Sequence, residues 1–139
     1  MDEAKYSTFR VLAELDRLPE VFGFISRFFV SRGFDDSFCK KMQIAVEEIF
    51  VNIASYAYPD DDRGDVVIEC AVDDGYAVMR FRDLGIPYDP LKKDDPVIGD
   101  PKGMTIGGYG IFMVKQIMDQ VEYRYDDLTK ENILTMRKK

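Results

Sequence analysis

Three polar side chains share one face of a largely apolar helical segment in the middle of the sequence, and Glu47, about 100° round the helix, is interpreted as a solvated flank. Glu48, Asn52 and Ser55 recur at i, i+4 and i+7 within residues 44–56, so they project from one face of the predicted helix. A buried carboxylate or amide without a partner is costly, so this face needs protein groups, water or a ligand opposite it. It is either a satisfied polar stripe facing solvent or a site for a hard cation, where Asn52 binds Mg²⁺ and Glu48 orients or deprotonates a hydroxyl.

A second candidate site is Asp83-x-Gly85, which comes at the end of a predicted strand. A carboxylate fixed at a strand end can accept a hydrogen bond from the exocyclic amine of adenine. A glycine two residues later leaves room for the ring to lie against the backbone. The alternative is an ordinary turn, in which Asp-x-Gly is common.

A third candidate site is the glycine-rich start of a predicted helix, where Gly107, Gly108 and Gly110 stand close together. Free N–H groups and the helix dipole favour an anion there, and glycine allows a phosphate to approach closely. The alternative is a helix start that needs unusual dihedral angles. The segment is no Walker motif, since no Gly-Lys-Ser/Thr follows, and no dinucleotide fingerprint, since no βαβ unit surrounds it.

Composition excludes several other kinds of chemistry. The sequence has no histidine, which excludes Ser-His-Asp and Cys-His nucleophiles and nearly every catalytic zinc site. A net charge of -7 argues against direct nucleic-acid binding, and the basic residues 137–139 are interpreted as a solvated tail. Two cysteines, no signal peptide and no apolar run of membrane-spanning length predict a cytoplasmic protein without disulfides or a membrane segment.

The pattern of apolar residues, prolines and glycines predicts the elements that position these groups. Helices are expected from Leu18 to Ser31, from Asp35 or Asp36 to Tyr58, and from the glycine cluster to Met118. Strands are expected at 5–15, 66–72, 76–82, 121–125 and 133–136, with a long loop over 83–106. This order predicts one domain over residues 1–139. It would be an α+β two-layer sandwich with a mixed, mainly antiparallel sheet and helices on one face.

Taken together, the three sites resemble the boxes of the GHKL, or Bergerat-fold, ATPases. Glu48-x-x-x-Asn52 is similar to the N-box of that superfamily, Asp83-x-Gly85 to its G1 box, and Gly108-x-Gly110 to its G2 box. Within the superfamily, residues 47–52 and 56–59 resemble the anti-sigma factor serine/threonine kinases, as do the small size and the single-domain layout. One departure is Tyr56, which stands where the family has a basic residue after the N-box.

The resemblance implies a role for each box. Glu48 would be the general base or hydroxyl-positioning residue, and Asn52 would bind the Mg²⁺ that bridges the ATP phosphates. Asp83 would read the adenine amine, and Gly85 would make space for the ring. The ATP-binding residues are expected to be Asn52, Ser55, Tyr56, Asp83, Gly85, Thr105, Gly107, Gly108 and Gly110.

The resemblance also implies an activity, namely phosphoryl transfer from ATP to a serine or threonine of a small anti-anti-sigma (STAS) protein. A sigma factor would be the competing partner, and the charge added by phosphorylation would release the STAS protein. The alternative is a catalytically silent regulator that binds ATP and switches partners. Homodimerisation is suggested by analogy, and the aromatic residues of the first helix form either core or a partner surface; they are Phe22, Phe24, Phe28 and Phe29.

Overall fold

The computed structural model of the protein describes residues 5–59, 62–92 and 108–139, with only the helical backbone described at 108 and 109. Its strands are β1 (Ser7–Leu12), β2 (Asp65–Asp73), β3 (Tyr76–Asp83), β4 (Gln120–Asp126) and β5 (Glu131–Lys138). Its helices are α1 (Leu18–Ser31), α2 (Asp36–Tyr56) and α3 (Gly108–Ile117), with short 3₁₀ turns at Leu15–Arg17 and Pro90–Lys92. The predicted order of elements is therefore confirmed, apart from these two turns.

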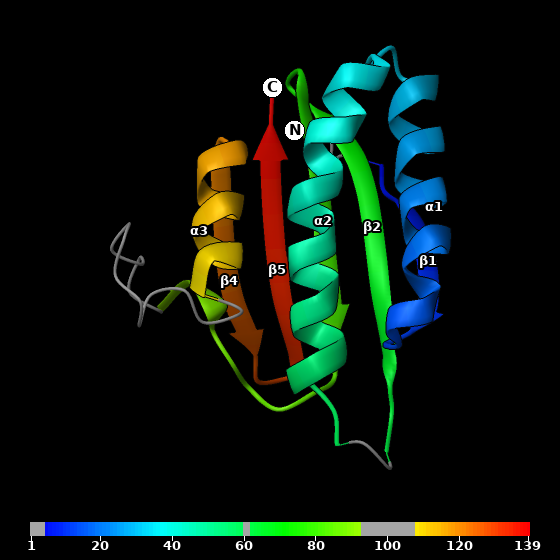
Figure 1. Ribbon diagram of the computed structural model, residues 1–139. Coiled ribbons are helices and arrows are strands. Elements are labelled where there is room, and N and C mark those ends of the chain that lie inside the picture. The colour runs from blue at the N-terminus through cyan, green and yellow to red at the C-terminus, as the bar shows by residue number, and fades with distance from the viewer. Residues whose placement is uncertain (1–4, 60–61, 93–107) are drawn as a thin grey trace.

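The strands form one sheet in the order β1-β2-β3-β5-β4, and the three helices lie side by side on one of its faces (Figure 1). The expected α+β two-layer sandwich is confirmed. All pairings among the described strands are antiparallel, so the sheet is not mixed. The register places Asp83, the last residue of β3, opposite Asn132 near the start of β5. None of the described helices is long and apolar enough to cross a membrane.

Local sequence signals explain where α2 begins and ends. At its start, the Asp35 side chain accepts a hydrogen bond from the Phe38 N–H at 2.8 Å and so caps the helix, which decides between the two expected positions, Asp35 and Asp36. At its end, the helix stops at Tyr56, two residues earlier than predicted. The carbonyl of the next residue, Ala57, accepts a hydrogen bond from the Ile86 N–H at 2.9 Å, which joins the end of α2 to the loop after β3.

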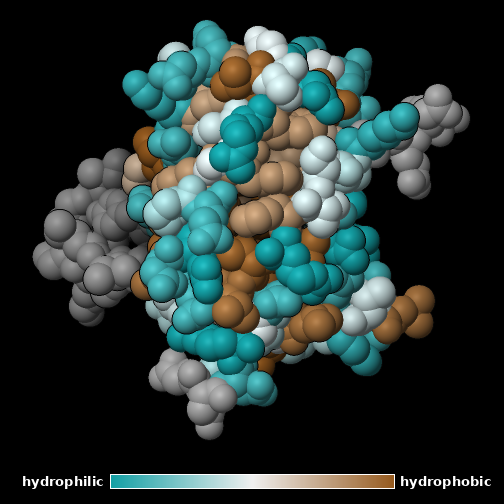
Figure 2. Space-filling view, turned by 90° about the vertical axis from the view of Figure 1, so that its right-hand side faces the viewer, coloured by the Kyte–Doolittle hydropathy of each residue, from teal (hydrophilic) through white to brown (hydrophobic). Residues whose placement is uncertain are grey.

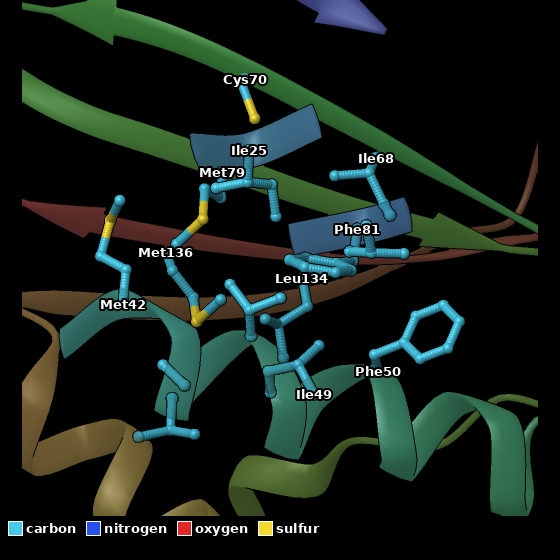
Figure 3. Packing of buried hydrophobic residues seen from close by; sticks show 14 of the residues in the cluster. Ile25, Met42, Ile49, Phe50, Ile68, Cys70, Met79, Phe81, Leu134 and Met136 are labelled. Atoms are coloured by element: carbon cyan, nitrogen blue, oxygen red, sulfur yellow. The ribbon is translucent and has the colours of Figure 1, made fainter. Parts of the chain in front are cut away.

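The core lies between the helices and the sheet, with α2 at its centre (Figure 3). Met42, Ile49 and Phe50 of α2 face Phe81 of β3 and Met136 of β5, and all five are almost completely buried. Burial of a large apolar side chain of this kind contributes about 1.5–3 kcal/mol. One face of α2 is therefore held firmly against the sheet, which fixes the direction of its other side chains.

The aromatic residues of α1 belong to this core. Phe28 and Phe29 are buried, and Phe22 and Phe24 are half-buried and pack against the core cluster. The Phe24 ring stacks on Phe9 of β1 with 5.2 Å between the ring centroids. Figure 2 shows the side of the molecule that α1 and β1 form, with apolar surface surrounded by hydrophilic residues. Phe28 and Phe29 are therefore core residues, whereas Phe22 and Phe24 lie at the edge of the core and remain partly exposed.

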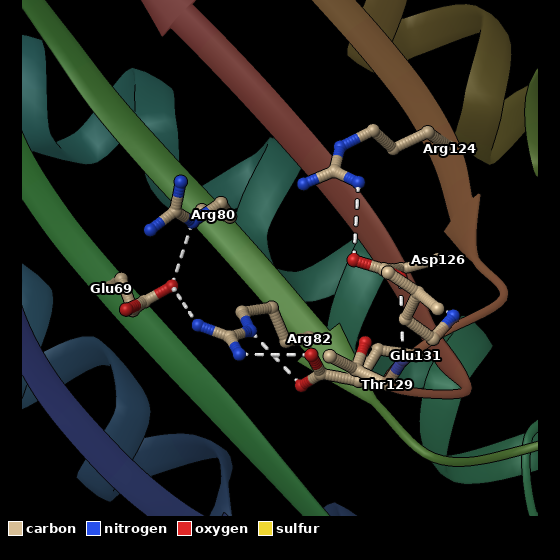
Figure 4. A network of polar contacts seen from close by, with 8 residues as sticks. Glu69, Arg80, Arg82, Arg124, Asp126, Thr129 and Glu131 are labelled. Atoms are coloured by element: carbon tan, nitrogen blue, oxygen red, sulfur yellow. Dashed lines mark hydrogen bonds and ion pairs between the residues drawn. The ribbon is translucent and has the colours of Figure 1, made fainter.

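The other face of the sheet bears a network of ion pairs instead of helices (Figure 4). The Glu69 carboxylate, only 8% exposed, accepts hydrogen bonds from Arg80 at 2.7 Å and Arg82 at 3.2 Å. Arg82 also donates to both carboxylate oxygens of Glu131, at 2.9 and 3.0 Å. Burial raises the pKa of Glu69, but the hydrogen bonds and charges of the two arginines outweigh it and lower the pKa below its ordinary value.

The C-terminal residues are not a free tail, contrary to the sequence-based interpretation. Arg137 and Lys138 continue β5, where Arg137 pairs with Asp73 at 3.4 Å. The Lys138 ammonium group donates to the Ile117 carbonyl at the end of α3, at 2.9 Å. Backbone pairing with β3 and β4 extends through these basic residues, and charge alone did not reveal it.

The ion pairs of Glu69 lead to a prediction about the free energy of unfolding. Glu69→Gln removes the carboxylate charge beside two arginines, so we expect the free energy of unfolding at pH 7 to fall by about 1–3 kcal/mol. Because the pKa of Glu69 is lowered in the folded protein, its contribution is present above the ordinary value of 4.5 and is lost as the pH falls below it. The difference between wild type and variant should therefore shrink at acid pH.

Urea unfolding at a series of pH values measures this difference. The matched control is Glu122→Gln, at an exposed glutamate of β4, and it should change stability by less than about 0.5 kcal/mol. A Glu69→Gln variant as stable as wild type at pH 7 would contradict the assigned role.

Candidate functional site

A pocket opens between the second half of α2, the ends of β3 and β5, and the loop that follows β3. Its walls are mainly apolar and include a few polar side chains, which is the usual composition of a small-molecule site. The lining residues are Ile49, Asn52, Ile53, Tyr56, Ala57, Phe81, Asp83, Ile86, Tyr88, Pro90, Tyr123, Asn132 and Leu134. Two of the predicted boxes, represented by Asn52 and Asp83, thus meet in one pocket.

The Asp83 carboxyl group is the most buried polar group of this pocket, with the residue 5% exposed. Its Oδ1 accepts hydrogen bonds from the Gly85 N–H and from the Asn132 side-chain amide, both at 2.9 Å. Burial raises the pKa of Asp83 above its ordinary value, and these two hydrogen bonds only partly oppose that effect. Among the described residues both bonds use Oδ1, which leaves Oδ2 as an acceptor for a donor on a ligand.

Asn132 holds this arrangement together, and sequence reasoning missed it. The residue is 6% exposed. Its side-chain Nδ2 donates to Asp83, to the Ile86 carbonyl at 2.9 Å and, more distantly, to the Gly85 carbonyl at 3.3 Å. Its Oδ1 accepts from the Tyr88 N–H at 3.2 Å and from the Tyr123 hydroxyl. The only signal in the sequence is an asparagine leading into the apolar pair Ile133-Leu134 of the last strand.

The packing of the protein itself requires a glycine at position 85. A Cβ atom on Gly85 would lie 2.6 Å from the Cβ of Ala57 and even closer to the Ala57 carbonyl oxygen. The absence of a side chain therefore lets the loop after β3 pack against the end of α2. From the sequence we expect Gly85 to make space for a ligand ring, and the structure adds that the position of its missing side chain is occupied by the end of α2.

Tyr58 forms hydrogen bonds on the other side of the same loop, next to Asp83. Its hydroxyl donates to the Asp65 carbonyl at 2.7 Å and accepts from the Leu84 N–H at 2.8 Å. Burial raises the pKa of Tyr58, which keeps the hydroxyl protonated and able to donate at neutral pH. The backbone next to Asp83 is thus fixed by Asn132 and Gly85 on one side and by Tyr58 on the other.

The side chains of the polar stripe of α2 do not all line the same pocket. Asn52 is half-buried and lines the pocket, and so does the more exposed Tyr56. Ser55 does not line it, because this residue lies about 100° round the helix from Tyr56. Ser55 instead borders a separate hollow with residues of the 13–16 segment and Arg63. The spacing i, i+4, i+7 defined the stripe correctly but could not show where its last member faces.

Glu48 lies one turn before Asn52, next to α3, and is not among the residues lining the pocket. Burial raises the pKa of its half-buried carboxyl group, and the neighbouring charge of Glu47 raises it further. Glu47 itself is exposed, as expected for a solvated flank. The raised pKa makes Glu48 a stronger base than a free glutamate.

The third box is described only in part. Gly108 is the first residue of α3, and Gly110 follows in its first turn, beside Glu48. Thr105 and Gly107 lie outside the described residues, as does most of the predicted loop. The described part of α3 packs against α2, so the glycine-rich helix start lies on the same side of the sheet as Glu48 (Figure 1).

Comparison with known proteins identifies the class to which this fold and site belong. Residues 11–138 match the family model of the histidine kinase-like ATPase domain. The chain therefore belongs to this ATP-binding family, and its resemblance to the GHKL superfamily is confirmed.

Individual relatives agree with the anti-sigma branch. The chain is 30% identical over 101 residues to the serine-protein kinase RsbW of Listeria monocytogenes serotype 4a, and the alignment covers 68% of this chain and 64% of that protein. It is 24% identical over 99 residues to the RsbW of Oceanobacillus iheyensis, covering 65% and 60% respectively. The aligned part is thus less than two thirds of the length of either relative.

A solved structure supports the fold. The crystal structure of the RsbU and RsbW domains of Rv1364c from Mycobacterium tuberculosis superimposes with a TM-score of 0.65 at 14% identity. The match covers 96% of this chain and 32% of that one. At this identity the likeness concerns the fold alone, and it includes nearly every element described above.

The contacts of Asn132 lead to a prediction about the affinity for Mg-ATP. Asn132→Asp replaces a donor by a carboxylate that repels Asp83 and further raises its pKa, so Asp83 becomes a poorer acceptor for an exocyclic amine. We expect the affinity for Mg-ATP, measured by calorimetry at pH 7.5, to fall by about tenfold or more, which is about 1.4 kcal/mol. Wild type should bind ATP and ADP in preference to GTP, which has no amine at the corresponding ring position.

The control is Thr135→Val, in the same strand but facing the opposite side of the sheet, and it should retain wild-type affinity. Circular dichroism establishes that both variants are folded. A folded Asn132→Asp protein that binds ATP as tightly as wild type would show that Asn132 does not position Asp83.

Proposed function

We propose that the protein is an ATP-dependent serine/threonine protein kinase that acts as an anti-sigma regulatory factor. Its substrate would be a STAS-type anti-anti-sigma protein, and a sigma factor would compete for the same kinase. The similarity to serine-protein kinases named RsbW supports this class of activity. The observation that carries the proposal is the position of the half-buried Glu48 carboxyl group, which lies beside the first turn of α3 and one helical turn from Asn52 of the pocket.

The nucleotide would bind with its base in the pocket and its phosphates toward the start of α3. The exocyclic amine of adenine would donate to Oδ2 of Asp83, while Ile86 and Tyr56 would cover the faces of the ring. The phosphates would then extend past Asn52. This orientation agrees with the buried acceptor at one end of the site and with the glycine-rich helix start at the other.

Magnesium fits the donor chemistry of the site. The Asn52 side-chain oxygen is a hard ligand of the kind Mg²⁺ accepts. The described residues contain no cluster of three or more acidic, cysteine or histidine side chains that could hold a metal by themselves. The ion would therefore take its remaining ligands from phosphates and water, and its charge would stabilise the transferred phosphoryl group.

Glu48 would accept a proton from the hydroxyl group of the substrate serine. In the transfer step, the hydroxyl oxygen of the substrate serine forms a bond to the γ-phosphorus, and the bond from that phosphorus to the bridging oxygen of ADP breaks. The hydroxyl proton passes to the Glu48 carboxylate, whose raised pKa makes it a better proton acceptor. Asn52 and Glu48 are about 6 Å apart along the helix axis, which separates phosphate binding from proton acceptance.

The second candidate function is a catalytically silent regulator that binds ATP and switches partners. It is favoured by the fact that the pocket is lined without Glu48, so nucleotide binding does not require that carboxylate. This function would retain Asn52 and Asp83 but would leave the acceptor protein unmodified.

Transfer of radiolabelled phosphate to a candidate STAS protein distinguishes the two functions. Glu48→Ala should bind Mg-ATP within about threefold of wild type but transfer phosphate at least about a hundredfold more slowly, because general-base catalysis contributes 10²–10⁴-fold. The matched control is Glu47→Gln, at the exposed neighbour one position earlier, and it should transfer at the wild-type rate.

Equal labelling by Glu48→Ala and wild type would remove the catalytic assignment. Tight ATP binding without any labelled product would favour the silent regulator.

A homodimer is also proposed, by analogy and because the side of the molecule that α1 and β1 form has apolar surface (Figure 2). Phe24 of α1 is only half-buried where it stacks on Phe9 of β1. Replacing the half-buried Phe24 by serine should then convert the dimer to a monomer in light-scattering measurements at micromolar concentration. A monomeric mass for the wild type under these conditions would refute the proposal.

A further inference from the structure

Gly110 of α3 faces Glu48 of α2 across the contact between the two helices. A Cβ atom on Gly110 would lie 2.9 Å from Cδ and 3.5 Å from Cγ of Glu48, and closer still to its Oε2. Contacts below 3.0 Å are essentially never made by a real Cβ atom, so either the end of the Glu48 side chain or the first turn of α3 would have to move. With Glu48 in its present position, the site tolerates only glycine at position 110.

The backbone itself does not require glycine here. Among the described glycines only Gly33 and Gly75 have positive φ angles, whereas Gly110 lies within an α-helix. Glycine inside a helix is about 1 kcal/mol less favourable than alanine. The glycine is therefore unfavourable for the helix, and what it provides is space, which the Glu48 carboxyl group fills.

We propose that Gly110 is a positioning residue for Glu48. The first turn of α3 limits where the Glu48 carboxylate can stand, and the missing side chain at position 110 allows it to lie between the two helices. This proposal rests on the proposed kinase function, in which Glu48 receives the proton of the acceptor. It differs from the role that the family resemblance implies for Gly110, which is close approach of a phosphate.

The contact between Gly110 and Glu48 links the start of α3 to the polar stripe of α2. Glu48 is in contact with the same helical turn that begins with Gly108, so a displacement of that turn also displaces the carboxylate. The three atoms nearest to a Cβ on Gly110 all belong to Glu48, whereas Asn52, one turn further along α2, lines the pocket wall. In this proposal the nucleotide contact expected at Asn52 is independent of α3, whereas the position of the proton acceptor depends on α3.

A double-mutant cycle tests the proposal with Gly110→Ala, Glu48→Ala and the double variant. In the wild-type background, Gly110→Ala should lower the urea midpoint of unfolding and slow phosphate transfer at least about tenfold. Mg-ATP affinity, measured by calorimetry, should stay within about threefold. In the Glu48→Ala background the collision is gone, so the same substitution should leave the midpoint unchanged or raise it, as alanine usually does in a helix.

Gly23→Ala is the matched control, since Gly23 is also in a helix and the nearest atom to a Cβ there, at the end of the Arg27 side chain, is 3.0 Å away. It should not slow transfer. Two results would overturn the proposal. One is an equal loss of ATP affinity in both backgrounds, which would mean that Gly110 serves phosphate approach. The other is a Gly110→Ala substitution that changes neither stability nor transfer in the wild-type background.

The experiments distinguish a failure of the proposed function from a failure of the positioning role. If wild-type protein labels no substrate, the kinase assignment fails, but the unfolding arm of the cycle still measures whether Gly110 and Glu48 interact. If labelling occurs and the unfolding cycle shows no coupling, the kinase assignment stands and the positioning role fails.

Discussion

The buried hydrogen bond between Asp83 and Asn132 joins two neighbouring strands at the point where the pocket begins. Asp83 ends β3 and Asn132 stands near the start of β5, so their contact exists only when those strands pair in the observed register. The same asparagine holds the carbonyl of Ile86 and the N–H of Tyr88. A shift of one residue between the strands would turn one of these side chains to the opposite face of the sheet. The site therefore forms only when the two strands pair in the observed register.

The second constraint is the burial of α2. This helix supplies core residues such as Phe50, a pocket residue in Asn52 and a candidate proton acceptor in Glu48. Its packing against the sheet fixes its rotation, and this rotation decides which polar side chains reach the pocket. The two faces of the sheet divide the remaining tasks. The helix-covered face supplies apolar contacts and the carboxyl group of Asp83, while the other face satisfies its charges through Glu69 and its two arginine partners.

Much of the fold and the outline of the site follow from short stretches of sequence. The Asp35 cap, the apolar period of α2 and the hairpin between β2 and β3 are local signals, and all of them are found in the structure. What could not be predicted depends on residues far apart in the chain. Asn132 contacts a loop more than forty residues earlier. Gly110 matters because of Glu48, and Ser55 faces another hollow because tertiary packing sets the rotation of its helix.

Placing Glu48, Asn52 and Tyr56 on one uninterrupted helix has a consequence for insertions and deletions. Each added or lost residue between them rotates everything beyond it by about 100° and shifts it by about 1.5 Å. A loop would absorb such a change locally, but a packed helix transmits it to both the core and the pocket. The length of this segment should therefore be nearly invariant among functional descendants of the gene, even where its individual apolar residues are exchanged for others of similar size.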